Sequence, residues 1–393
     1  MKNLSIRKSN LQELVECLKN QSLMKRDFVL PNTILTMEKG QLVIKNENEN
    51  LENLLKELKI ESSKGNSNLV LNVMEQAHLQ ISTRLNIPKS YYDKCLKNSL
   101  ELFDHNVNNW LAADGYNYLL RCFINESETE GYCRAVLSNR YNIIDNYDVL
   151  LATLESVKKS GINLKIEQCD LTDRKMYIQF TCPEIEIESE RLLKNYKSPN
   201  GGNSGHGIIT GFVIGNSEVG SGYFYVVPRA KILACSNGLT FTKDAFSKVH
   251  LGAKLESQKS FSWSEKTKQK NYELILSQTT DAINTFCSKD YLNGKVNEII
   301  SLNQQKIESP INVIRNVSKV HAFDKYKEEK LLEYFFKQED NTAFGVTQSM
   351  TYYAHADASN GDEQYEMEEL AIDVLRNLRK YDVEYKEKYS RKN

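Results

Sequence analysis

Glycine, aromatic and cationic residues gather between Gly201 and Leu239 more densely than anywhere else in this 393-residue chain. Such a density of glycine marks positions where the backbone takes positive φ or where another group approaches it closely. Two apolar runs, at 208–214 and 222–227, predict strands that the polar turn GNSEVGS separates. We therefore expect the functional chemistry of the chain to lie in this stretch.

The second of these strands carries side chains suited to a nucleic-acid strand. Tyr223 and Tyr225 would project from one face, and Arg229 and Lys231 follow a few residues later. An aromatic ring for stacking beside a cation for phosphate is the combination that single-stranded nucleic acid requires, and each stacked base contributes about 1–3 kcal/mol. Arg134, Arg140 and Tyr141 would extend the same surface. The structural alternative is that the tyrosines pack a half-buried sheet and the cations are solvated.

The glycine-rich loop and turn over 201–220 give a second, catalytic hypothesis. Glu218, next to Asn216, could act as a general base or as a metal ligand together with His206. The chain lacks the GxxxxGK(S/T) phosphate loop, a dinucleotide fingerprint and a second acid at defined spacing. The competing interpretation is that Glu218 caps the turn by accepting backbone N–H groups between residues 215 and 220. The sequence therefore identifies no cofactor, no metal set and no catalytic residue.

Composition limits the class of protein. The net charge of −1 provides no global cationic field, so affinity for phosphate would have to come from a local patch. Eight cysteines are scattered without a CxxC pair or a histidine at zinc-ligand spacing, which is typical of free thiols in a reducing cytosol. No apolar run approaches the roughly 18 residues of a membrane span. We expect a cytoplasmic protein with no membrane partner.

Hydrophobic periodicity predicts the elements that position these residues. Residues 1–65 predict an N-terminal unit with a helix over 7–20 and a hairpin over 37–45, closed by the polar run 62–68. Residues 66–250 predict a core domain that opens with a helix from Leu69 and a second one after Pro88. Residues 251–393 predict a helical C-terminal region.

The fold class follows from the rest of the core domain. Its further elements are strand pairs at 116–123 with 131–138 and at 164–169 with 175–181, and a helix from about Asp145 to Gly161. We predict an α+β fold, in which a central, mostly antiparallel sheet over 116–241 is crossed by this helix. Helical segments would precede and follow the sheet.

The order of several segments resembles a phage- and plasmid-encoded family catalogued as domain of unknown function 932. The matching pieces run from about residue 70 to about residue 375 and are RLNIPKSYY, NNWL, RAVLSNRYNIIDN, GFVIGNSEVGSGYFYVVPRAKILACSNGL and FGVTQSMTYYAH. The resemblance implies a mobile genetic element, and hence the host cytoplasm, but no reaction. A sheet crossed by one helix, followed by a hairpin with tyrosine and basic residues, is also similar in outline to Rad52-type single-strand annealing proteins.

These observations favour a non-catalytic, phage- or plasmid-associated nucleic-acid-binding protein, which would bind or anneal single-stranded DNA in recombination. A homo-oligomer is expected, because a near-neutral protomer can build a continuous basic groove by repetition. The alternatives are an enzyme or anti-defence factor that acts on a nucleotide or host protein through the loop 201–220, and a structural protein of the virion. The sequence does not distinguish DNA from RNA.

Overall fold

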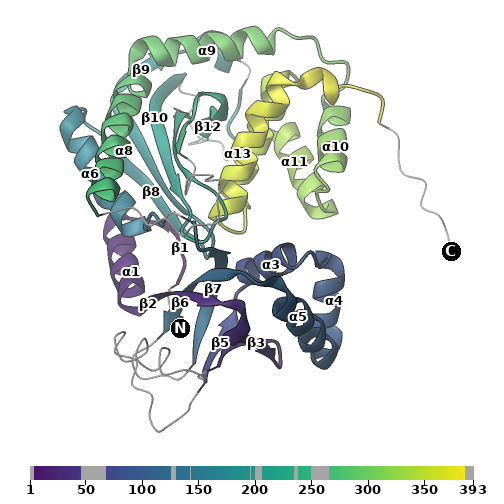
Figure 1. Ribbon diagram of the computed structural model, residues 1–393. Helices are drawn as coiled ribbons and strands as arrows, with labels where there is room; N and C mark the ends of the chain where they lie inside the picture. The colour runs from purple at the N-terminus through teal and green to yellow at the C-terminus, as the bar shows by residue number, and fades with distance from the viewer. Residues whose placement is uncertain are drawn as a thin grey trace, which may run out of the picture.

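Two mostly antiparallel sheets form the frame of the protein, where the sequence predicted one (Figure 1). The computed structural model describes residues 4–45, 68–124, 130–141, 143–194, 196–199, 206–233, 238–248 and 265–385. Helices flank both sheets, so the predicted α+β class is confirmed. The single sheet over 116–241 is wrong, because its strands divide between the two sheets.

Sheet A is antiparallel throughout and holds the glycine-rich stretch. Its strands in spatial order are β1 (Ile6–Ser9), β8 (Lys165–Leu171), β9 (Met176–Glu188), β10 (Gly207–Asn216), β11 (Phe224–Ile232) and β12 (Gly238–Thr240), with β13 (Phe246–Lys248) also paired to β11. Every residue of β10 is buried. A strand covered on both faces reads as a nearly continuous apolar run, as GIITGFVIGN does.

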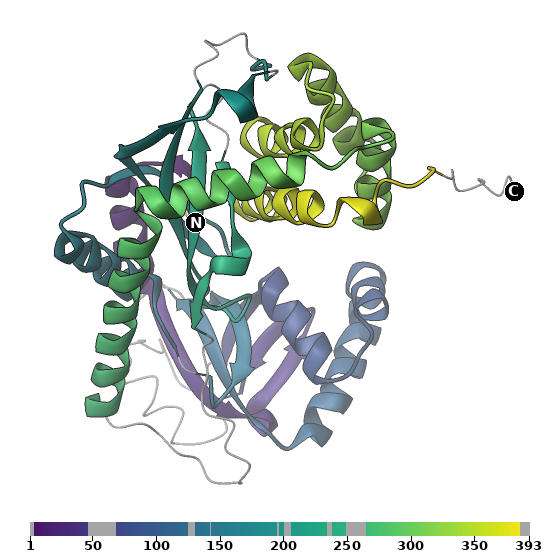
Figure 2. The same cartoon turned by 90° about the horizontal axis from the view of Figure 1, so that it is seen from above.

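Helices cover both faces of sheet A (Figure 2). Phe212 and Ile214 pack with side chains of α1 (Leu11–Met24), α6 (Asn146–Ser160) and α8 (Glu265–Phe286). Val213, whose side chain points to the other face, packs with Tyr365 of α13 (Gly361–Arg376). The predicted helix across the sheet is α6. Sheet A is therefore the middle of three layers around β10, and neither face of that strand is open to a stacking base.

Sheet B is smaller and packs helices on one face. Its strands in spatial order are β2 (Lys25–Pro31), β6 (Asn117–Ile124), β7 (Glu130–Ser138), β5 (Leu69–Val73), β4 (Gln41–Ile44) and β3 (Leu35–Glu38). The helices are α3 (Glu75–Arg84), α4 (Lys89–Asn98) and α5 (Leu100–Asp114), and Ile81, Phe103 and Val107 fill the core beneath them. The helix predicted from Leu69 is wrong over β5, which pairs parallel with β7 and antiparallel with β4. Tertiary pairing overrides the local helical pattern there.

The predicted N-terminal unit over 1–65 contributes strands to both sheets. β1 is the edge of sheet A, paired with β8, whereas β2, β3 and β4 belong to sheet B. The predicted hairpin over 37–45 corresponds to β3 and β4. The predicted linker at 62–68 falls outside the described residues except at Asn68, and so does the predicted boundary at 250.

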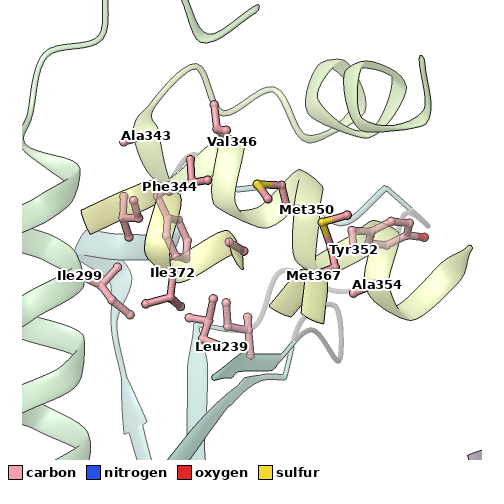
Figure 3. Packing of buried hydrophobic residues seen from close by; sticks show 14 of the residues in the cluster. Leu239, Ile299, Ala343, Phe344, Val346, Met350, Tyr352, Ala354, Met367 and Ile372 are labelled. Carbon is pink, nitrogen blue, oxygen red and sulfur yellow. The ribbon is translucent and has the colours of Figure 1, made fainter. Parts of the chain in front are cut away.

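The described part of the C-terminal region is helical, as predicted. After α8 it contains α9 (Lys289–Asn303), α10 (Pro310–Val320), α11 (Lys325–Gln338), α12 (Ala343–Ala356) and α13; the shorter elements of the chain are α7 (Glu190–Leu193), η1 (Asn32–Ile34), η2 (Thr242–Asp244) and η3 (Leu378–Lys380). Figure 3 shows Phe344, Met350, Met367 and Ile372 in one apolar cluster with Leu239 of β12. This core attaches the C-terminal helices to sheet A.

A buried ion pair fixes α13 on sheet A. Arg229 of β11 donates from Nε to Glu368 Oε2 at 3.0 Å and from Nη2 to Oε1 at 3.1 Å. Thr240 Oγ1 donates to the same carboxylate at 2.9 Å. Burial alone would raise the pKa of Glu368, but the charge of Arg229 and the hydrogen bond from His355 hold it far below its usual range. Gly238 provides the space for the Arg229 guanidinium, because a Cβ atom at position 238 would overlap it.

This contact predicts a stability effect at Arg229. Arg229→Met leaves the Glu368 carboxylate buried without its cation, and we expect a loss of about 3–5 kcal/mol in the free energy of unfolding. The double variant Arg229→Met/Glu368→Leu removes both charges and should recover most of that loss. Urea unfolding followed by far-UV circular dichroism measures both; a double variant no more stable than the single one would contradict the prediction.

Candidate functional site

Glu218 lies in the turn between β10 and β11, and its carboxylate is completely buried. Lys25 Nζ lies 2.5 Å from Oε1, and Arg134 Nη1 lies 2.9 Å from Oε2. The backbone N–H of Asn146, at the start of α6, donates to Oε1 at 2.7 Å. A turn of sheet A is thereby attached to two strands of sheet B and to the helix that crosses sheet A.

Arg121 of β6 extends this contact into a larger network. Its Nη1 donates to the Glu218 carbonyl oxygen at 3.0 Å. Its Nε and Nη2 bind the Asp27 carboxylate, both at 3.1 Å, and Nη2 also binds Asp145 at 2.7 Å. We call this set the ion network. Its members are Lys25, Asp27, Arg121, Arg134, Asp145 and Glu218.

The electrostatics of Glu218 argue against acid–base chemistry. Burial would raise its pKa, but the charges of Arg134, Lys25 and Arg121 outweigh burial and hold the pKa at about 2. A general base works best when its pKa lies near the operating pH, and both oxygens of this carboxylate already accept hydrogen bonds. The predicted turn cap also needs correction, because the backbone donor is Asn146 and not a residue between 215 and 220.

The other residues of the catalytic hypothesis do not meet Glu218. His206 precedes β10 and Asn216 ends it, so the strand of Gly207–Asn216 separates them by about 30 Å. Asn216 Nδ2 is engaged with the carbonyl of Ile144 at 3.1 Å and with Asn146 Oδ1 at 2.8 Å. Residues 201–205 of the loop lie outside the described residues. The loop therefore assembles no catalytic set among the residues that are described.

Two of the cations predicted to bind phosphate are buried in ion pairs. Arg134 is bound to Glu218, and its guanidinium lies 4.0 Å from the centre of the Phe123 ring. Arg229 is bound to Glu368. Both side chains are already neutralised and shielded from water, so the prediction that they contact phosphate is wrong for this conformation.

The other residues predicted to bind nucleic acid in and before β11 also contact neighbouring side chains. Lys231 Nζ lies 2.7 Å from Glu167 Oε2. The Tyr225 ring is half-buried and packs edge-on against Tyr223 at 6.1 Å between centroids. Tyr223 itself is 44% exposed, because it precedes the strand. The predicted row of two stacking rings is therefore reduced to one exposed ring.

Three turns meet at the end of sheet A and bring other predicted residues together. Residues 139–141 follow β7, residues 172–175 join β8 to β9, and residues 217–223 join β10 to β11. Tyr141 Oη donates to the Ser217 carbonyl at 3.1 Å, and Ser217 Oγ donates to the Arg174 carbonyl at 2.8 Å. We call these segments the turn cluster. Its exposed side chains include Arg140, Arg174 and Tyr223.

A polar cleft of about 1080 Å³ opens beside the turn cluster. Helices α11 and α13 contribute lining residues, as do α3 and α4, and in Figure 1 the first pair of helices lies above the second. Its lining residues come from six segments and are Leu4–Arg7, Met74–Gln76, Leu79, Lys89, Leu171–Arg174, Lys327, Ser359–Glu363 and Glu366. A smaller groove of about 480 Å³ shares Lys327, Glu363 and Glu366 with it.

The cleft contains charges of both signs, and some of them are already paired. Lys327 binds Glu363 at 2.5 Å, and Lys89 binds Asp93 at 2.5 Å. Asp362 accepts hydrogen bonds from Tyr177 Oη at 2.7 Å and from Thr172 Oγ1 at 3.0 Å. The guanidinium groups of Arg7 and Arg174 make no ion pair with any residue that the structure describes. These two groups remain available to an anion.

Sequence reasoning missed most of the ion network, although one signal for it is present. Arg121 and Arg134 each interrupt an otherwise apolar strand, YNYLLRCF and GYCRAVLS. Arginine is almost never fully buried unless it is paired, so each position indicates a buried partner. Nothing in the sequence names that partner, because Asp27 and Glu218 lie 94 and 84 residues from the arginines they bind.

No model of a known protein family, no curated protein and no solved structure matches this chain. Within the described ranges, no three histidine, cysteine or carboxylate side chains are grouped so that they could hold a metal ion. No helix in those ranges is long and apolar enough to cross a membrane. These comparisons therefore add nothing to what the sequence and the geometry support.

The ion network predicts a pH-dependent stability. Glu218→Gln leaves Lys25 and Arg134 without their shared anion, and we expect a loss of about 3–5 kcal/mol in the free energy of unfolding near neutral pH. The folded-state pKa of about 2 lies below the ordinary value of 4.5. The charge of Glu218 therefore stabilises the fold above the ordinary pKa, and this contribution is lost as the pH falls through about 2.

The measurement is urea unfolding at several pH values between neutral and about 3. The difference between wild type and Glu218→Gln should narrow as the pH falls. Glu155→Gln is the control, because Glu155 is exposed on α6 and its pair with Lys159 should contribute under about 1 kcal/mol. If the free energy of unfolding of wild type and Glu218→Gln differed by the same amount at every pH, the prediction would be wrong.

Proposed function

We propose that this protein binds single-stranded nucleic acid, through the turn cluster and the adjoining cleft, in phage or plasmid DNA metabolism. The observation that carries the proposal is the meeting of three turns, which places exposed Arg140, Arg174 and Tyr223 at one end of sheet A beside a polar cleft. Exposed cations and an exposed ring are the components of single-strand binding. The proposal moves the site from the face of the sheet to its end.

The charges in the cleft limit where a strand could lie. The guanidinium groups of Arg7 and Arg174 are available to phosphates. Glu75, Asp173 and Glu366 line the same cleft and repel any phosphate that comes close to them, so a bound strand would have to follow the arginines. The net charge of the chain is only −1, so phosphate would have to be attracted by individual exposed cations such as Arg140 and Arg174.

The context of the proposal comes from the sequence resemblance. The segment order similar to domain of unknown function 932 favours a mobile genetic element and the host cytoplasm. The outline similarity to single-strand annealing proteins favours a homo-oligomer, in which repeated turn clusters would form a longer track for the strand. DNA is favoured over RNA by this context alone.

Salt-titrated binding to a fluorescent single-stranded oligonucleotide tests the cations. In Arg140→Ala/Arg174→Ala we expect weaker binding and a logarithmic salt slope smaller by about 1.4, because each phosphate contact on a single strand contributes about 0.7. Lys158→Ala/Lys159→Ala is the control with the same change of charge, at the far end of α6. Absence of binding by the wild type at low salt, or equal slopes in the two double variants, would reject the proposal.

Tyr223→Ala tests stacking separately from charge. We expect binding to weaken by about 1–3 kcal/mol, the contribution of one stacked base, with the salt slope unchanged. Tyr223→Phe keeps the ring and should bind as the wild type does. Equal weakening in both variants would show that the ring does not stack on a base.

A further inference from the structure

The first turn of α3 faces the cleft without a cap. Met74 occupies the N-cap position, and no side chain there accepts a hydrogen bond from the helix. The first N–H groups of a helix have no partner within it, and they carry the positive end of the helix dipole. In contrast, α11, α12 and α13 each have a capping side chain, from Asp324, Thr342 and Asn360 respectively.

Gln76 provides a second, independent sign of a ligand at this place. It lies in the first turn of α3, is only 7% exposed and lines the cleft. Its side-chain amide has no hydrogen-bond partner within the described part of the chain. Its amide atoms are not among the fully buried ones that lack a partner, so they reach the cleft and are free to bind a ligand there.

The cations of the cleft fit an anionic partner. Arg7 of β1 and Arg174 of the β8–β9 turn line the same space with guanidinium groups that are not ion-paired to described residues. Guanidinium groups bind phosphate oxygens in bidentate geometry, and helix N-termini donate backbone N–H groups to the same oxygens. The two kinds of donor come from separate elements and meet at one cleft.

We infer that the first turn of α3, with the Gln76 amide and the guanidinium groups of Arg7 and Arg174, binds a phosphate group. The phosphate belongs to a nucleic-acid backbone or to a free nucleotide, and the same donors serve both. The carboxylates of Glu75, Asp173 and Glu366 line the cleft and oppose an anion. Those of Asp362 and Glu363 oppose it less, since hydrogen bonds or an ion pair already engage them. The inference stands without the nucleic-acid proposal, because a free nucleotide satisfies it.

The experiment uses the full chain and isothermal titration calorimetry with inorganic phosphate, a nucleoside monophosphate and a single-stranded oligonucleotide. Gln76→Glu replaces the amide donor by an anion of the same shape, and we expect phosphate and nucleotide to bind about tenfold more weakly or worse. An acidic residue in the first turn stabilises a helix, so this variant should fold. Glu75→Gln removes an opposing charge at an exposed position, and we expect binding a few-fold tighter, about threefold.

Gln76→Met is the neutral variant of similar size, and it should weaken binding less than Gln76→Glu. Lys158→Ala should change nothing. Should Gln76→Glu fail to fold, the opposite change in Glu75→Gln carries the test alone. The inference is overturned if none of the three probes binds the wild type, or if they bind wild type, Gln76→Glu and Glu75→Gln equally.

The arms of the experiment separate the two sources of phosphate. If phosphate and nucleotide respond to these variants but the oligonucleotide does not bind, the site serves a free nucleotide and the nucleic-acid proposal fails. If the oligonucleotide alone binds and responds, the phosphate comes from the backbone. If the oligonucleotide binds and is indifferent to Gln76→Glu and Glu75→Gln, the nucleic-acid proposal survives and this inference fails.

Discussion

The carboxylate of Glu218 joins a turn of sheet A to two strands of sheet B, and the turn cluster is built around that contact. Taking such a group out of water costs several kcal/mol unless its partners are well placed. Here Lys25, Arg134 and the Asn146 N–H supply those partners from three different elements. Because each partner is itself buried or bound to another charge, no member can move without leaving a neighbour uncompensated. The turn over 217–223 is therefore fixed against sheet B.

A second constraint is that sheet A is covered on both faces. Alternate residues of β10 pack toward α6 and α8 on one face and toward α13 on the other, and the Arg229–Glu368 pair fixes α13 in place. A strand enclosed in this way has no surface for a ligand, so the turns at its end and the cleft beside them are better candidates for recognition. The turn cluster lies at one such end, and the cleft opens next to it.

Local pattern predicted the elements well and their assembly poorly. The strand pairs later seen as β6–β7 and β8–β9, and the helix α6, follow from residue alternation and capping signals within about 30 residues. The division into two sheets cannot be predicted in this way, because β1 pairs with β8 and β2 pairs with β6, and the two strands of each pair lie far apart in the sequence. Strand β5 is the clearest case. Residues 69–73 have a helical pattern in the sequence, but in the structure they pair with β4 and β7.

The same limit applied to the candidate site. Arg140 and Tyr223 were predicted from residue type, and both are exposed. Arg134 and Arg229 have the same chemistry, but carboxylates 84 and 139 residues away neutralise them. Arg7, Gln76 and Arg174 were missed because no sequence spacing relates β1, α3 and the β8–β9 turn. An arginine in an apolar strand indicates a buried pair, whereas an arginine in a polar turn is the better candidate for a ligand.

The division into buried and exposed cations has a physical consequence for how the protein responds to salt. Mobile ions screen exposed charges over about 10 Å at moderate ionic strength, but they screen buried pairs much less. Arg134 and Arg229 are buried together with their carboxylates, Glu218 and Glu368, so these two contacts should persist as salt rises. Arg140 and Arg174 are exposed, so an anion bound to them should dissociate over the same range. The turn that contains Glu218 is thus bound to sheet B by contacts that salt weakens little. The adjacent turns carry exposed arginines, whose contacts with a ligand salt would weaken.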